Sequence, residues 1–307
     1  MELSVIIVNW NTRDLLAQCL ESVYANPPNG EFEIIVVDNG SSDGSVDMVR
    51  ERFPEVLLIE NLENTGFARA NNQAIRISAG RYIQLLNSDA MVTPDSLEAM
   101  ATFMDFHPQA GVVGPMLINR DGSFQASFAE FPTLWTELCL LTGISRLVIG
   151  PYAPSPRPKL YAVPEQVDWV AGAAIMVRRA AIDRVGLMDE TYAFYSEETD
   201  WCWRMNQWGW QVWYIPLIKV YHIGAASSRK RSHESYIQLY DSKVRFFKTA
   251  YGPRAANRLR FVIKVMAFLR LTVRALMLPI TTVFSKSRTM PRIQQDIALI
   301  RHMISSD

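Results

Sequence analysis

Three carboxylic acids fall within four residues in the second half of the sequence: Glu197, Glu198 and Asp200. An aromatic, partly apolar segment follows them, which predicts that they occupy the start of a helix. Acids in a first helical turn are stabilised by the helix dipole, so a purely structural interpretation is open. The functional interpretation is that one carboxylate faces a cleft as a general base, its pKa adjusted by burial and by its acidic neighbours.

Three other polar residues each follow an apolar, β-branched segment: Asn9, Asp38 and Asp89. Ligands of parallel sheets bind beyond the carboxyl ends of the strands, which is where these residues are expected. Each one alone is also a typical turn residue. Asp89 offers the carboxylate oxygen that Mg²⁺ or Mn²⁺ prefers, and a diphosphate would complete the coordination shell. His222, after another apolar segment, is either a structural histidine or a second ligand of that metal ion.

The elements that must position these residues alternate between strand and helix patterns. Uninterrupted apolar segments, typical of strands buried on both faces of a parallel sheet, cover residues 5–8, 33–38, 56–59 and 82–86. Helical patterns follow them at residues 12–24, 46–52, 68–79 and 94–106. This order predicts an α/β fold: a Rossmann-like, mostly parallel sheet with right-handed crossovers and flanking helices.

The second half of the chain is less regular. Pro and Gly are frequent up to Arg157, and no structure is predicted there. Strand character then returns at 167–177 and at 211–214 and 218–222, with a helix at 179–185 between them. We expect a catalytic domain over residues 1–250, with a nucleotide-binding half of about 1–110 and an acceptor and base half of about 111–250, and a helical tail over 251–307.

Charge divides the chain more sharply than its net value of zero indicates. The segment up to Ser242 has 18 basic and 29 acidic residues, whereas the segment from Lys243 has 13 basic and 2 acidic ones. The acidic body argues against a nucleic-acid partner. Three scattered cysteines and the lack of a signal-peptide pattern favour a cytoplasmic location, and no apolar run reaches the roughly 18 residues that span a bilayer.

The basic tail also carries an apolar stripe at helical spacing, made of Val262, Met266, Leu269, Val273 and Leu276. One interpretation is that the stripe packs on the catalytic domain or on a second subunit of a homo-oligomer. The other is that the helix lies on an anionic membrane surface, which would make the enzyme a peripheral protein of the inner face of the cell membrane.

Several of these segments, taken as a set, resemble inverting glycosyltransferases of family 2, which have the GT-A fold. The matching segments, in chain order, are residues 4–11 (SVIIVNWN), 36–45 (VVDNGSSDGS), 64–72 (NTGFARANN), 86–89 (LNSD), 172–174 (GAA), 186–190 (GLMDE), 195–204 (YSEETDWCWR) and 220–227 (VYHIGAAS). The resemblance covers roughly residues 3–251 and is greatest to the rhamnosyltransferase-type members. It implies a sugar nucleotide, a dTDP- or UDP-sugar, as donor and Mg²⁺ or Mn²⁺ as cofactor.

The resemblance also implies roles for single residues. Asp38 would contact the nucleotide base, with Val8 and Asn9 nearby, and Glu198 would be the catalytic base with Glu197 beside it. Metal would be bound by two residues, Asp89 and His222. Four residues of the same motifs are expected to line the donor site: Asn39, Gly66, Asn87 and Gly172.

Two motifs depart from the family pattern. The DxD-type motif is reduced to Asn87-Ser88-Asp89, which removes one carboxylate and makes His222 more important for the metal. The acidic pair is Glu-Glu in place of Glu-Asp or Asp-Asp, which makes the side chain of the base one methylene longer.

The activity expected from these motifs is transfer of a sugar, with rhamnose as a candidate, to a hydroxyl of a saccharide or lipid-linked saccharide in bacterial surface polysaccharide synthesis. One alternative is a non-catalytic protein that binds sugar nucleotides or serves as a scaffold. A nucleotidyltransferase is the other, but it would carry a Gly-rich, basic phosphate loop after the first strand, where this chain has Asn9-Trp10-Asn11-Thr12.

Overall fold

The computed structural model describes residues 1–156, 163–192, 195–224, 234–281 and 286–305. Its centre is a sheet whose first four strands are all parallel, in the order β3-β2-β1-β4. Their bounds are β1 (Leu3–Asn9), β2 (Phe32–Asp38), β3 (Leu57–Glu60) and β4 (Tyr82–Asn87). The predicted alternation of strands and helices in the first half of the chain is confirmed.

The rest of the sheet is mixed. Strand β10 (Ala174–Arg178) lies antiparallel between β4 and β6 (Ala110–Ile118), and β11 (Gln211–His222) runs parallel to β6. Two short strands, β5 (Ala90–Val92) and β8 (Glu165–Val167), pair antiparallel with β11. A separate two-stranded sheet joins β7 (Phe128–Ala129) to β9 (Trp169–Val170). The predicted mostly parallel α/β sheet is therefore confirmed.

Helices cover both faces of the sheet, because alternate side chains of each buried strand point to opposite faces. In β1, Val5 and Ile7 pack with α1 (Arg13–Ala25), α2 (Ser45–Arg52) and α4 (Ser96–Phe106). Ile6 belongs to the core of the other face, with α3 (Phe67–Ile77), α7 (Arg179–Val185) and α8 (Glu197–Gln207). This two-sided burial explains why most positions of these strands are apolar, although the buried Ser4 and Gln84 are exceptions.

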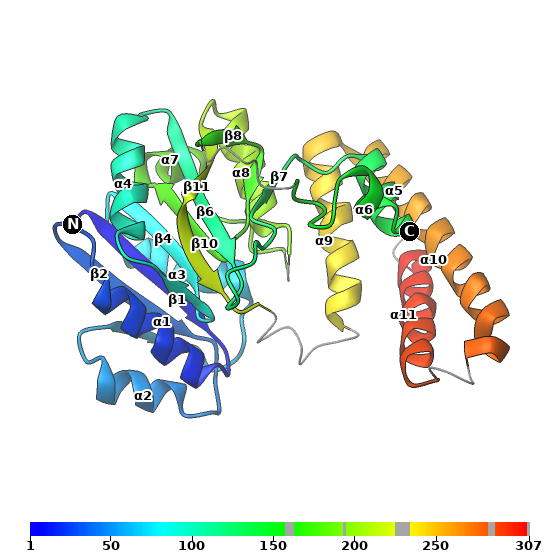
Figure 1. Ribbon diagram of the computed structural model, residues 1–307, viewed down its shortest axis with the longest axis horizontal. Helices are drawn as coiled ribbons and strands as arrows, with labels where there is room; N and C mark the ends of the chain where they lie inside the picture. The colour runs from blue at the N-terminus through cyan, green and yellow to red at the C-terminus, as the bar shows by residue number, and fades with distance from the viewer. Residues whose placement is uncertain (157–162, 193–194, 225–233, 282–285, 306–307) are drawn as a thin grey trace.

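The remaining helices extend the second face away from the sheet. They are α5 (Leu134–Thr142), α6 (Ser145–Val148), α9 (Glu234–Tyr251), α10 (Pro253–Thr281) and α11 (Lys286–Ser305). Figure 1 shows α10 and α11 at one end of the long axis and α1 and α2 at the other. The expected boundary at residue 250 falls close to Gly252, between α9 and α10. No helix among the described residues combines the length and the apolar character needed to cross a bilayer.

The structure differs from the expected elements in the second half of the chain. Strand β6 lies in the stretch without predicted structure, where Gly111 and Gly114 weaken the strand pattern. Both glycines admit a neighbour closely: a Cβ on Gly111 would lie 2.7 Å from Cβ of Trp210, and one on Gly114 would lie 2.6 Å from Cβ of Val170. The two strands expected at 211–214 and 218–222 are one strand, β11, with an irregularity after Ile215. Residues 225–227 of the last motif lie outside the described residues.

Candidate active site

Asp89 and His222, the two residues predicted to bind metal, lie side by side. Strand β5 begins directly after Asp89 and pairs with the end of β11, so that His222 is opposite Ala90. This register places Nε2 of His222 3.3 Å from Oδ1 of Asp89. The backbone N–H of Ile223 donates to the carbonyl oxygen of Asp89 at 3.0 Å and fixes the two chain segments to each other.

Gln125 determines which nitrogen of the His222 ring carries the hydrogen. Its Nε2 atom donates to the backbone carbonyl of His222 at 2.9 Å and to Oδ1 of Asn119 at 2.7 Å, so this end of the amide is the NH₂ group. Its Oε1 atom then faces Nδ1 of His222 at 2.7 Å, and Nδ1 must be the donor. In the neutral ring the lone pair is therefore on Nε2, the atom next to Asp89.

Nε2 of His222 and Oδ1 of Asp89 fit a divalent cation, because two acceptors face each other. Two neighbouring ligands of an octahedral ion, each about 2.1 Å from it, lie about 3 Å apart, close to the observed 3.3 Å. Within the described part of the chain, no group of three or more His, Cys, Asp or Glu residues could hold a metal ion. The other ligands would have to be substrate phosphates and water, which is a usual arrangement for Mg²⁺.

The three acids of helix α8 differ in their surroundings. Asp200 is buried and engaged: Oδ2 accepts from Nε of Arg204 at 2.8 Å, and Oδ1 accepts from the hydroxyl of Tyr192 at 3.3 Å. By contrast, the Oε2 atoms of Glu197 and Glu198 are shielded from solvent and have no hydrogen-bond partner among the described residues. Asp200 is therefore a structural acid, and the two glutamates are left for chemistry.

Burial raises the pKa of both glutamates. The pKa of Glu197 lies well above its ordinary value, first because the side chain is buried and then because of the charge of Glu198. For Glu198, burial is again the largest cause, but hydrogen bonds from the backbone N–H groups of Glu198, Thr199 and Gly172 counteract it and lower the pKa. Because these donors favour the ionised form, we place the proton of the pair on Glu197 and the negative charge on Glu198.

The backbone before α8 is strained. Tyr195 and Ser196 both have positive φ angles, 67° and 68°, and Ser196 is the residue that precedes the first turn of the helix. Such a conformation costs about 1–3 kcal/mol for each residue that is not glycine, and it is concentrated at functional sites in proteins. This backbone conformation places the glutamate pair at the very start of α8.

Gly172 connects Glu198 with the pair formed by Asp89 and His222. A Cβ atom on Gly172 would lie 3.6 Å from both Cβ and Cγ of Glu198. The next residue, Ala173, accepts a hydrogen bond from the backbone N–H of Asn87 at 2.9 Å. The side-chain Nδ2 of Asn87 lies 3.4 Å from Nε2 of His222. A continuous series of contacts thus leads from the glutamate pair to the histidine.

Asp38 is joined to the same edge of the sheet through side-chain hydrogen bonds. Nδ2 of Asn9 donates to Oδ2 of the buried Asp38 at 2.8 Å, and Oδ1 of Asn9 accepts from the hydroxyl of Thr12 at 2.6 Å. The hydroxyl oxygens of Thr12 and Ser88 are 2.7 Å apart, and Ser88 precedes Asp89. The structure therefore brings Asp38, Asp89, His222 and Glu198 to one edge, at the carboxyl ends of β1, β2 and β4.

The other predicted donor-site residues lie along this edge. Val8 is opposite Asn87 in the parallel register of β1 and β4. The backbone N–H of Asn39 donates to the carbonyl of Asn9 at 2.8 Å, and Nδ2 of Asn39 donates to the carbonyl of Gly66 at 3.3 Å. Gly66 has a φ of 88° and precedes α3, a conformation that glycine adopts without strain. That these residues contact a nucleotide sugar stays a prediction.

Three residues of the site were not predicted from the sequence: Gln125, Thr12 and Ser88. The sequence shows Thr12 only as the end of the segment Asn9-Trp10-Asn11-Thr12 and Ser88 only as the middle of the shortened Asn87-Ser88-Asp89 motif, with no role in the site expected for either hydroxyl. Gln125 lies in the stretch for which no structure was predicted, and its contact with His222 has no local signal. One signal was overlooked: Asp200 and Arg204 are spaced i, i+4, which is the spacing of an ion pair on a helix.

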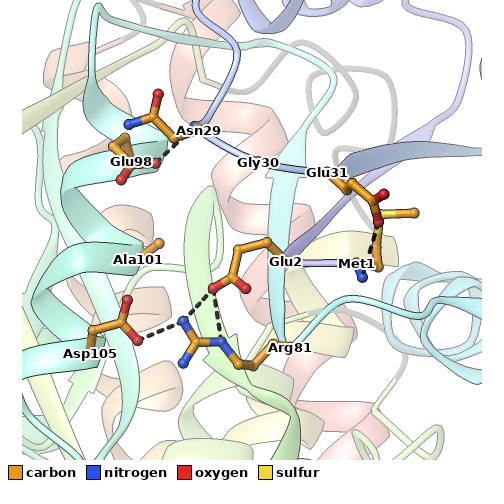
Figure 2. Close-up of a pocket in the computed structure, with 9 residues that line it drawn as sticks. All are labelled: Met1, Glu2, Asn29, Gly30, Glu31, Arg81, Glu98, Ala101 and Asp105. Carbon is orange, nitrogen blue, oxygen red and sulfur yellow. Dashed lines mark hydrogen bonds and ion pairs between the residues drawn. The ribbon is translucent and has the colours of Figure 1, made fainter.

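A hollow of about 560 Å³ lies at the opposite edge, where β1, β2 and β4 begin. Figure 2 shows Arg81 directed between Glu2 and Asp105, with both of which it forms ion pairs. The amino group of Met1 lies 3.5 Å from Glu31. Since the charged groups drawn there bind one another, we place the candidate site at the carboxyl edge.

Relatives of known activity are found for about two thirds of the chain. An N-acetylglucosaminyl-diphospho-decaprenol L-rhamnosyltransferase of Mycobacterium tuberculosis is 30% identical over 213 residues, which are 64% of this chain and 67% of the relative. A poly(ribitol-phosphate) beta-glucosyltransferase of Bacillus spizizenii is 35% identical over 136 residues, 42% of this chain but only 22% of that protein.

Solved structures show the same fold at low sequence identity. A structure of GalNAc-T7 with UDP, GalNAc and Mn²⁺ has a TM-score of 0.59 at 16% identity; it matches 81% of this chain, which spans 48% of the length of that one. The mannosyltransferase PcManGT of Pyrobaculum calidifontis, in complex with GDP-Man and Mn²⁺, has a TM-score of 0.56 at 17% identity and matches 99% of this chain and 86% of its own. The sequence profile of "Glycosyl transferase family 2" matches residues 4–185. This chain therefore belongs to glycosyl transferase family 2.

Proposed function

We propose that this glycosyltransferase transfers a sugar from a nucleotide diphosphate to an acceptor hydroxyl in one displacement, with inversion at the anomeric carbon. Glu198 accepts the proton of the acceptor hydroxyl while the oxygen of that hydroxyl attacks the anomeric carbon. The nucleoside diphosphate leaves from the opposite side. One base and no covalent enzyme intermediate are needed for this path. The observation that carries the proposal is the series of contacts from Glu198 through Gly172 and Asn87 to His222.

The environment of Glu198 suits a general base. Burial raises its pKa toward the working pH, and the backbone N–H groups keep it ionised in preference to Glu197. A base is most effective when its pKa is near the operating pH, because both its ionised fraction and its proton affinity are then high. Glu197 retains a proton in this scheme and limits the negative charge next to the reacting centre.

Asp89 and His222 would hold Mg²⁺ or Mn²⁺. The ion would neutralise the charge that develops on the leaving diphosphate. Asn9, Asp38 and Asn39 form the edge at which the nucleotide would lie, and Asp38 is the residue that would contact the base.

For the substrates, we propose a dTDP- or UDP-sugar, with rhamnose as the first candidate, and a lipid-linked saccharide as acceptor. The name of the mycobacterial relative supports this choice, because it joins rhamnose transfer to a diphospho-decaprenol acceptor. We further propose that the protein acts at the inner face of the cell membrane in the synthesis of a surface polysaccharide.

The test compares nucleoside diphosphate release by the wild type and by Glu198→Gln, with a panel of sugar nucleotides and Mn²⁺. The change should lower the rate by about 10²-fold or more, because general-base assistance is lost, while donor binding persists. Glu51→Gln, an exposed glutamate on α2, is the matched control and should keep the wild-type rate. Proton NMR of the anomeric product reports inversion. A Glu198→Gln enzyme that turns over at the normal rate, or a product with retained configuration, contradicts the proposal.

A further inference from the structure

Helix α10 has two apolar faces on opposite sides. Leu259, Ile263 and Ala267, spaced by four residues, are fully or almost fully buried in the core shared with α9 and α11. The opposite face is exposed: Phe261 and Phe268 have 67% and 63% of their surface accessible. The apolar face of a helix normally packs against a partner, and the outward apolar face of α10 lacks one within the described chain.

The structure covers only part of the apolar stripe expected from the sequence. Val262 and Met266 are partly buried against the core, whereas Leu269, Val273 and Leu276 are exposed. The stripe therefore lies beside the buried face of the helix, covered in its first turns and exposed in its last ones. The outward apolar surface, called the α10 outer face below, consists of Phe261, Val265, Phe268, Leu269, Val273 and Leu276.

A groove continues the α10 outer face onto α11. It has a volume of about 310 Å³, and it is lined by Lys264, Val265, Phe268, Leu269, Ile300 and Ile304. Ile304 is itself 62% exposed. The apolar surface thus spans two neighbouring helices at the end of the molecule (Figure 1). It forms one continuous patch, unlike the single exposed apolar residues that are scattered over any protein surface.

Charge distinguishes between the candidates for covering this surface. The sequence of α10 contains no acidic residue, and the chain from Lys243 onward has a net charge of +11. Arg254 and Arg258 are exposed and precede Phe261 at the spacing of the same helix face. The one acid of α11, Asp296, is fully buried and forms ion pairs with Arg270 and Arg274.

A second copy of this chain would bring a surface of the same positive charge against the first. An anionic lipid surface instead supplies opposite charge for the arginines and an acyl layer for the phenylalanines, which is how basic amphipathic helices bind bilayers. We infer that the α10 outer face and its groove dock on an anionic lipid bilayer. This inference rests on the proposed function in one respect: docking would bring the carboxyl edge of the sheet to a lipid-linked acceptor.

The experiment is flotation of the full chain with two kinds of vesicles. One is phosphatidylcholine alone, and the other contains about one third phosphatidylglycerol as the anionic lipid. We expect binding only to the anionic vesicles, and its loss at high salt, because screening weakens exposed charges. The double variant Phe261→Asp, Phe268→Asp should lower the bound fraction at least tenfold. Phe106→Asp, which changes a phenylalanine on α4 that is even more exposed (79%), should bind like the wild type.

Two results would overturn the inference. The first is a wild-type protein that stays unbound with anionic vesicles, or a double variant that binds as well as Phe106→Asp. The second is sedimentation analysis that shows a wild-type dimer converted to a monomer by the double variant while vesicle binding persists, because the face would then be an interface between copies. Nucleoside diphosphate release without vesicles should be the same in the double variant and the wild type, so failure of the transferase assay and failure of docking are separate outcomes.

Discussion

Gln125 offers a direct test of how the metal site is organised. It is not expected to touch metal or substrate, yet it fixes the ring nitrogen that His222 presents. The change Gln125→Met keeps the length of the side chain and removes all three hydrogen bonds, two donated by Nε2 and one accepted by Oε1. Without the acceptor at Nδ1, the His222 ring is free to place its hydrogen on Nε2, where it blocks metal binding.

The expected magnitude follows from these contacts. Loss of a partner for a buried donor costs about 1–3 kcal/mol, and loss of the group that orients a metal-ligating histidine typically lowers metal affinity about 10- to 100-fold. Since a tenfold change corresponds to about 1.4 kcal/mol, the two ranges agree. We therefore expect Gln125→Met to bind Mn²⁺ about 10- to 100-fold more weakly, in the presence of UDP or dTDP.

The assay titrates Mn²⁺ and records the free ion by electron paramagnetic resonance. NMR of ¹⁵N-labelled histidine reports the tautomer of His222 independently of any activity. Gln125→Glu keeps an acceptor for Nδ1 but loses the donors, so its tautomer should be retained even if the protein is less stable. Gln109→Met, which breaks the exposed amide contact with Gln211, is the matched control. Wild-type Mn²⁺ affinity in Gln125→Met, with the hydrogen still on Nδ1, would refute the reasoning.

Three other predictions concern single carboxylates. Asp89→Asn should weaken donor binding in Mn²⁺ but leave binding in a chelator unchanged, and calorimetric titration under both conditions checks this. The pKa of Glu197 is raised in the folded state. At pH values between the ordinary pKa of a glutamate and this raised pKa, the folded protein keeps a proton that the unfolded chain has lost, so the free energy of unfolding falls as the pH rises through this range. Glu197→Gln should therefore be more stable than the wild type toward urea at pH 8, with the gain vanishing near pH 4, and an equal gain at both pH values contradicts the assignment. Asp296→Asn should lower the free energy of unfolding by about 2 kcal/mol, which is less than the loss of a partner in a fully buried ion pair because Arg270 and Arg274 are partly exposed. An unchanged melting temperature would mean that this ion pair contributes nothing to stability.

The sequence was sufficient for the first half of the sheet, because burial on both faces makes most strand residues apolar and the polar residue that follows marks the strand end. Asn9, Asp38 and Asp89 were placed at the binding edge for this reason. Strand β6 was missed because Gly111 and Gly114 admit Trp210 and Val170, and such a requirement comes from distant parts of the chain.

The candidate site shows the same limit. The grouping of three acids at the start of α8 was visible, but which carboxylate is free depends on partners. Asp200 forms an ion pair with Arg204 one helical turn later, whereas Glu198 contacts Gly172, which lies in the connection between β9 and β10. Likewise, the role of Gln125 depends on a contact with His222, 97 residues further along the chain, and no local pattern encodes it.

Several unfavourable features coincide at the start of α8. Tyr195 and Ser196 adopt strained backbone conformations, Glu197 and Glu198 each have a buried oxygen with no partner among the residues that the structure describes, and burial raises the pKa of both acids. Each feature lowers the stability of the fold, and simple replacements, such as glycine for Ser196 or glutamine for Glu197, would remove it. Because local rules of stability are broken mainly where activity requires it, this coincidence supports the glutamate pair as the reacting centre, independently of the family motifs. The same reasoning separates it from the hollow around Arg81, where every drawn charge has a partner and no strain is stored.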